Sequence, residues 1–104
     1  MVMVELRSVE EFEELLSRET AIVFKHSTQC PISAAAHAEM EELAGRRDIY
    51  LVKVIESRQV SDAIERITGI RHESPQVIVL CKGKSVWHAS HRDVTAEAVE
   101  QALA

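Results

Sequence analysis

The sequence contains no apolar segment long enough to cross a membrane. A spanning helix needs about 20 consecutive apolar residues, and no run in the 104 residues approaches that length. The first residues, Met1-Val2-Met3-Val4-Glu5, also lack the basic region and the cleavage site of a secretion signal. We therefore expect a cytoplasmic protein with no membrane partner.

Positive charge and cysteine are both scarce. Lysine and arginine total 12 against 17 aspartates and glutamates, a net charge of −5, whereas nucleic-acid affinity rests on clustered basic side chains. We expect no nucleic-acid partner. The 2 cysteines, Cys30 and Cys81, are too few for a secreted disulfide framework. Cys81 lies in an almost wholly apolar segment, where cysteine behaves as a small hydrophobic residue, so we expect it to be buried.

Internal repeats, low-complexity tracts and linkers are also missing. Hydrophobic residues make up 46% and charged residues 28% of the chain, which is the usage of a globular protein. The length allows one hydrophobic core, and we expect residues 1–104 to form a single domain.

Hydrophobic periodicity predicts alternating strands and helices, in the order β-α-β-α-β-α-β-β-α. Capping residues mark the helix starts at Ser8 and Thr95, and Gly45 and Gly69 are natural stops. The third helix should bury a stripe that includes Ile67. The expected strands are 2–4, 21–25, 49–55, 76–81 and 85–88, and the last two form a hairpin through a turn at 82–84.

Cys30 is the leading candidate for a reactive residue. It lies where an apolar strand gives way to a helix, and the free amides and dipole of a first helical turn favour a thiolate. Pro31 suits the first helical position because its missing N–H would have no partner there. A dithiol oxidoreductase would carry its second cysteine at position 33, and here that residue is Ser33. The spacing therefore predicts monothiol exchange, and the Ser33 hydroxyl could hydrogen-bond the thiolate.

Histidine gives no metal motif. His88 and His91 are three apart in an extended segment, where side chains alternate faces, so they do not make a ligand pair. His37 lies two turns along the helix from Cys30, and we expect it to be simply exposed.

The chain resembles the thioredoxin superfamily, most clearly in residues 69–84, where a helix end and a loop lead to Pro75 and a buried strand. The resemblance implies an α/β thioredoxin-like fold, with a central mixed β-sheet flanked by helices. It also implies a cis bond before Pro75, in a loop that faces the active cysteine.

Within that superfamily the chain is most similar to the monothiol bacilliredoxins. The likeness rests on Phe24-Lys25-His26-Ser27-Thr28 leading into Cys30-Pro31-Ile32-Ser33, and on Ser74-Pro75-Gln76. It implies removal of bacillithiol, a cysteinyl glucosamine–malate thiol, from protein mixed disulfides through Cys30. Bacillithiol would be a co-substrate, bacillithiolated proteins the partners, and no cofactor or metal would be bound. We expect a monomer or a weak dimer.

Ligand contacts are expected around the two loops. A cation near Cys30 would stabilise the thiolate and could meet the malate carboxylates. The candidate ligand contacts are the basic residues Lys25, His26, Arg71 and His72, together with the hydroxyl residues Thr28 and Ser74.

Two other functions remain open. Cys30-Pro31-Ile32-Ser33 resembles in outline the Cys-Gly-Phe-Ser motif of glutaredoxin-like iron–sulfur cluster carriers, which share a cluster between two chains. The Gly-Gly-Asp signature that binds glutathione is absent, with Ser90-His91-Arg92-Asp93 near its place. Alternatively, the chain is a redox-responsive interaction protein that is itself modified at Cys30.

Overall fold

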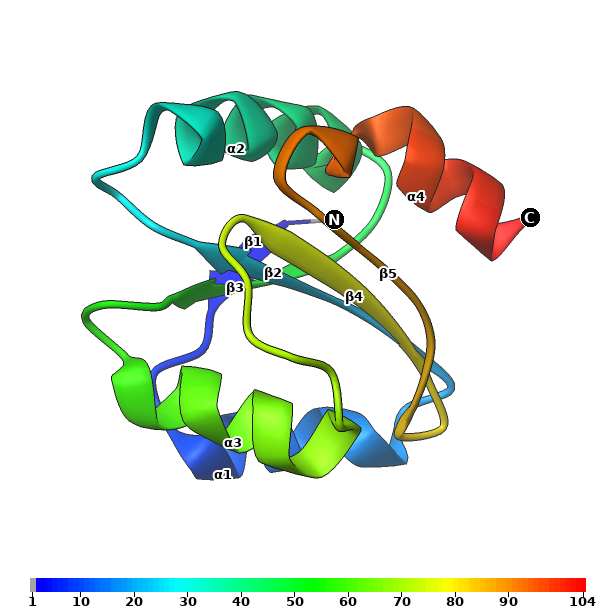
Figure 1. The fold of residues 1–104 in the computed structure, drawn as a ribbon. Coiled ribbons are helices and arrows are strands. Elements are labelled where there is room, and N and C mark those ends of the chain that lie inside the picture. Colours follow the sequence, from blue (N-terminus) through cyan, green and yellow to red (C-terminus); the bar gives the residue numbers. More distant parts are fainter. Residues whose placement is uncertain (1) are drawn as a thin grey trace.

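The computed structural model describes residues 2–104 and contains one five-stranded mixed sheet with helices on both faces (Figure 1). The strand order is β1-β3-β2-β4-β5. Strands β1, β3 and β2 run parallel, and β4 is antiparallel to both β2 and β5. Strands are β1 (Met3–Glu5), β2 (Thr20–His26), β3 (Ile49–Lys53), β4 (Gln76–Cys81) and β5 (Lys84–Ser90). Helices are α1 (Val9–Glu14), η1 (Leu15–Ser17), α2 (Pro31–Ala44), α3 (Arg58–Thr68), η2 (His91–Asp93) and α4 (Ala96–Leu103).

The helices form two layers. Helices α1 and α3 cover one face of the sheet, and α2 and α4 cover the other. Phe24, Met40 and Val99 are fully buried in the core between the sheet and the α2–α4 layer, and Phe12 and Ile64 in the core between the sheet and the α1–α3 layer. This is the predicted α/β architecture, because each face of β2 must be covered.

The predicted caps lie where the sequence indicates. Ser8 and Glu11 form a complete capping box at α1, and the Thr95 hydroxyl accepts a hydrogen bond from the Ala98 amide at α4. Gly69 ends α3 with φ 75, in the left-handed region. Gly45 also follows its helix, but it keeps right-handed geometry with φ −68.

Two expectations were wrong in detail. Strand β3 ends at Lys53 rather than at residue 55, because the chain turns there and the Ser57 amide donates to the carbonyl of Lys53. Ile67, expected in the buried stripe of α3, is 38% exposed, so burial ends one turn before the helix does.

The central strand positions the residues that follow it. Because β2 and β4 are antiparallel and Lys25 pairs with Gln76, the end of β2 and the start of β4 meet at one edge of the sheet. The loop before Cys30 and the loop containing Pro75 therefore share that edge. Within residues 2–104, no helix combines the length and the hydrophobicity needed to cross a bilayer.

Candidate active site

Cys30 is the N-cap residue of α2. Its backbone is extended, with φ −116 and ψ 126, and Pro31 occupies the first turn of the helix. The side chain is partly exposed. Local sequence explains the geometry, since proline at the first helical position needs no hydrogen-bond partner for its nitrogen.

The surroundings of Cys30 favour the thiolate. The backbone amides of Ser33 and Ile32 lower the pKa of the thiol below its usual 9.0, partial burial opposes them, and the Ser33 hydroxyl adds a smaller lowering. The sulfur makes no capping hydrogen bond of ordinary geometry. The nearby amides lower the pKa because they stabilise the thiolate more than the thiol. The helix start therefore supplies what a nucleophilic thiol needs.

Ser33 is fully buried beneath the Cys30 loop. Its hydroxyl oxygen accepts a hydrogen bond from the Ser27 amide at 3.4 Å, which ties the loop to α2. The hydroxyl proton is free to be donated to the Cys30 sulfur, and this contact is the smallest of the influences that lower the pKa of the thiol. Ser33 thus stands where a dithiol protein has its second cysteine, and its supporting role stays a prediction.

The Pro75 loop has the expected conformation. The Ser74–Pro75 bond is cis, as predicted, and Pro75 is buried. The carbonyl of Pro75 accepts a hydrogen bond from the His91 amide at 2.8 Å. The Ser74 hydroxyl is buried and has no partner among residues 2–104. A role for Ser74 and Pro75 in binding substrate stays a prediction.

Two histidines lie beside Cys30. The ring centroids of His26 and His37 are 4.8 Å apart, and both rings approach Phe24. Burial, followed by the charge of His37, lowers the pKa of His26. His37 is half-buried and hydrogen-bonds Glu41, so the expectation of a simply exposed residue was wrong. Both histidines line a cavity of about 240 Å³ that also includes Thr28 and Cys30.

Lys25 points to the opposite face of the sheet. Its side chain is fully buried, and its Nζ has no hydrogen-bond partner within the described residues. Burial lowers the pKa of Lys25 to about 8, against the opposing charges of Glu65 and Asp62 on α3. Lys25 therefore lies on the α1–α3 side of the sheet, and a role for it in ligand binding stays a prediction.

The remaining predicted contacts are spread around the same edge of the sheet. His72 hydrogen-bonds Ser61 through its ring and Glu65 through its amide, and burial lowers its pKa. Arg71 is exposed, while its carbonyl accepts a hydrogen bond from Gln76. Thr28 donates to Glu56 at 3.4 Å. Of these three residues, only Thr28 lines the cavity beside Cys30.

Cys81 was expected to be buried, and that expectation was wrong. It is the last residue of β4 and is exposed, after five buried residues. The strand leaves the core there and enters the turn at Lys82 and Gly83. Six strand residues span roughly 20 Å, so Cys81 lies at the opposite end of β4 from Pro75 and is too far to resolve a disulfide at Cys30.

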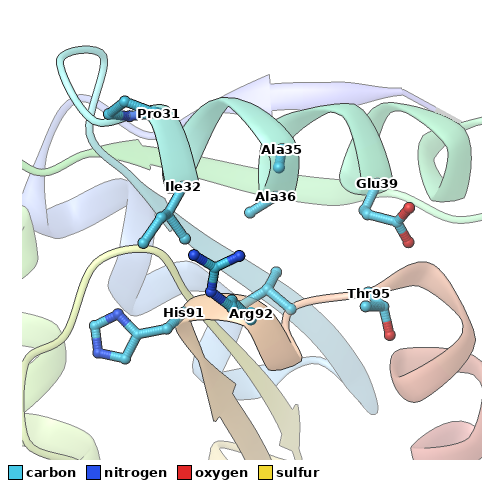
Figure 2. A pocket seen from close by; sticks show the side chains of 9 residues that line it. Pro31, Ile32, Ala35, Ala36, Glu39, His91, Arg92 and Thr95 are labelled. Carbon is cyan, nitrogen blue, oxygen red and sulfur yellow. The ribbon is translucent and has the colours of Figure 1, made fainter.

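A larger cavity on the other side of Cys30 was missed by the sequence analysis. It has a volume of about 450 Å³ and lies between the first half of α2 and the segment from η2 to Thr95 (Figure 2). The short helix η2 depends on His91 in the left-handed region, with φ 56, and no sequence signal marked that turn. Among the described residues, no group of three or more histidine, cysteine or acidic side chains is arranged to hold a metal ion.

Comparison with known proteins gives the same architecture. A solved structure described as a candidate oxidoreductase with a thioredoxin fold is 35% identical, with a TM-score of 0.93 over 99% of this chain and 95% of that chain. Thioredoxins of Malassezia sympodialis and Schistosoma mansoni are each 17% identical, with TM-scores of 0.77 over 99% of this chain and 88% and 97% of theirs. At that identity the thioredoxins show the fold alone.

One protein family, described as monothiol bacilliredoxin BrxC, matches residues 4–99. The matched range includes the Cys30 loop, the Pro75 loop and every strand except the first residue of β1. With a thioredoxin-like fold and a single cysteine at the start of α2, the chain belongs to the monothiol bacilliredoxin family BrxC.

Proposed function

We propose that this protein removes bacillithiol from protein mixed disulfides, with Cys30 as the catalytic nucleophile. The observation that carries the proposal is the position of Cys30 at the N-cap of α2, where the amides of Ser33 and Ile32 lower the pKa of the thiol. Family membership supports bacillithiol as the small thiol.

The reaction needs one protein cysteine. The Cys30 thiolate attacks the bacillithiol sulfur of the mixed disulfide, a new sulfur–sulfur bond forms, and the substrate protein leaves as a thiolate that takes a proton from water. A second bacillithiol thiolate then attacks the bacillithiol sulfur on Cys30. It restores the Cys30 thiolate and releases bacillithiol disulfide, so the bacillithiol removed and the bacillithiol added leave together for each mixed disulfide reduced.

Ser33 and Cys81 fit this cycle. Ser33 cannot form the internal disulfide that would expel bacillithiol from Cys30, so regeneration falls to a second small thiol. Cys81 lies roughly 20 Å along β4 from the Pro75 loop, which faces Cys30, so it cannot attack a disulfide at Cys30 of the same chain.

The proposal predicts that Cys30→Ser abolishes release of bacillithiol from a bacillithiolated protein, while Cys81→Ser keeps most of it. The measurement is the rate of bacillithiol loss from the substrate protein, followed by intact mass. Cys81→Ser is the matched control, because it removes the other thiol by the same change.

Retention of activity in Cys30→Ser would refute the catalytic assignment. A folded but inactive Cys81→Ser would refute the one-cysteine cycle. The same assay with a glutathionylated substrate tests the identity of the thiol, and faster loss of glutathione than of bacillithiol would contradict the proposed substrate.

A further inference from the structure

The cavity between α2 and η2 is built from an apolar floor and a charged rim. Ile32, Ala35 and Ala36 line it from α2, and Val94 lines it from the opposite side. The rim carries three ionisable side chains, Glu39, His91 and Arg92. Its volume of about 450 Å³ lies within the range of small-molecule sites.

Two of these three rim side chains already have partners. Glu39 accepts a hydrogen bond from the Ala96 amide at 2.8 Å, so its negative charge faces the start of α4. His91 pairs with Glu73 at 3.2 Å. Arg92 is exposed, and within residues 2–104 it is paired with no carboxylate. Figure 2 shows its guanidinium group pointing across the cavity toward Ile32.

The cavity adjoins the Cys30 loop on one side and the Pro75 loop on the other. Pro31 and Ile32, which line it, are the two residues directly after Cys30. On the other side, the His91 amide donates to the Pro75 carbonyl, and Ser90 pairs with Gln76 at the start of β4. Arg92 is thereby held on the same edge of the sheet as the Pro75 loop.

We propose that this cavity binds the carboxylate-bearing arm of the small thiol that is disulfide-linked to Cys30, with Arg92 pairing with a carboxylate. The inference rests on the proposed function and adds to it a binding site and a specificity-determining residue. The chemistry of bacillithiol matches that of the cavity. Its sugar can pack on the apolar floor, and its malate offers two carboxylates to the planar guanidinium of Arg92.

The smaller cavity on the other side of Cys30 suits an anion less well. It holds about 240 Å³, and its histidine wall faces Glu41, which hydrogen-bonds His37. Thr28, on its rim, donates to Glu56. None of the described residues that line the smaller cavity is an arginine or a lysine, so it offers no permanent positive charge to a dicarboxylate arm.

The test compares Arg92→Gln with the wild type on two substrates. One is a protein mixed disulfide with bacillithiol, and the other is the same disulfide made with the cysteinyl-glucosamine thiol that lacks malate. Arg66→Gln is the matched control, because it removes an exposed arginine from α3 in the opposite layer. The readout is kcat/KM for release of the small thiol.

We expect Arg92→Gln to lower kcat/KM about tenfold for the bacillithiol substrate, the effect of losing one charge-assisted hydrogen bond, and to leave the malate-free substrate unchanged. Arg66→Gln should change neither. In the Cys30→Ser variant, added bacillithiol should shift the amide NMR signals of residues 32–36 and 91–95, and it should not do so when Arg92→Gln is also present.

The test distinguishes failure of this inference from failure of the proposed function. An unchanged Arg92→Gln with an active wild type would overturn this inference and leave the proposed function standing. An equal loss on both substrates would also overturn it, because Arg92 would then not be recognising the carboxylates. A wild type inactive on both substrates would overturn the proposed function and this inference together.

Discussion

Lys25 and His26 are neighbours on β2 that point to opposite faces of the sheet, and burial lowers the pKa of both. Each side chain is held where its charged form loses hydration. Lys25 is the stronger case, with its pKa lowered to about 8 and its Nζ unpaired within the described residues. Such a group opposes folding whenever it is protonated.

We predict that Lys25→Met raises the free energy of unfolding at pH 7. The pKa of Lys25 is about 8 when folded and near 10.5 when unfolded, so between these values the unfolded chain binds more protons and stability rises with pH. Below pH 8 the full penalty applies. Removing it should stabilise the protein by on the order of 1–3 kcal/mol, a figure that already includes the attraction of Asp62 and Glu65 for the ammonium.

The gain should shrink as the pH rises from 8 toward 10.5, which urea unfolding at several pH values will measure. Lys53→Met is the control, because the Lys53 side chain is 35% exposed and close to Glu5, so its removal should change stability little. A Lys25→Met variant that is less stable than the wild type at pH 7 would show that the ammonium is paired in solution.

Residue positions were predictable from sequence where local geometry decides them. Cys30 and Ser33 could be placed because a strand-to-helix junction with proline fixes both. The burial of Lys25 could not, because it depends on α3, which is distant in sequence. Cys81 shows the same limit, since an apolar run does not reveal where the strand leaves the core.

Element boundaries were likewise predictable where residues close in sequence decide them. The capping residues Ser8 and Thr95 and the stop at Gly69 act within a few residues, and each lies where the sequence indicates. The helix η2 was not predictable, because it depends on a hydrogen bond from the His91 amide to the distant Pro75 carbonyl. The end of β3 was placed two residues late, because the apolar residues of the turn at 54–57 read as a continuation of the strand.

The β4–β5 hairpin supplies a prediction at this scale. Gly83 has φ +81, and a Cβ there would lie 2.6 Å from the backbone oxygen of Leu16. Gly83→Ala should therefore cost roughly 2–4 kcal/mol, from backbone strain and from the clash. Gly69 has a similar φ of +75 with nothing within 4 Å, so Gly69→Ala should cost only about 1 kcal/mol.

Urea unfolding of both variants will separate the cost of backbone strain from the cost of the clash with Leu16. A larger drop in the denaturation midpoint for Gly83→Ala, with the slope unchanged, is the expected result. Equal losses in the two variants would mean that the turn moves away from η1 without cost, and that the contact with Leu16 does not hold the hairpin.

At the scale of the molecule, the sheet separates the two thiols. The sequence predicted a mixed sheet, and the thioredoxin-like resemblance implied that the Cys30 and Pro75 loops meet, as they do at one edge. Cys81 lies at the other end of β4. The distance between the ends of that strand, which no local pattern encodes, makes the molecule a monothiol protein despite its two cysteines.

This separation predicts what a second cysteine beside the first would do. In Ser33→Cys, the new thiol would be buried three residues after Cys30 in the first turn of α2, close enough for a disulfide. Oxidation with a small-thiol disulfide should then join the introduced thiol to Cys30 and give less mixed disulfide at Cys30, while the wild type accumulates the adduct. Intact mass and thiol counting measure both. Ala38→Cys is the control, because residue 38 is exposed and lies about two turns along α2 from Cys30, and it should keep the wild-type adduct at Cys30. If Ser33→Cys retained two free thiols at these positions after oxidation, Cys30 would not lie against the first turn of α2, and the lowering of its pKa by the helix start would lose its structural basis.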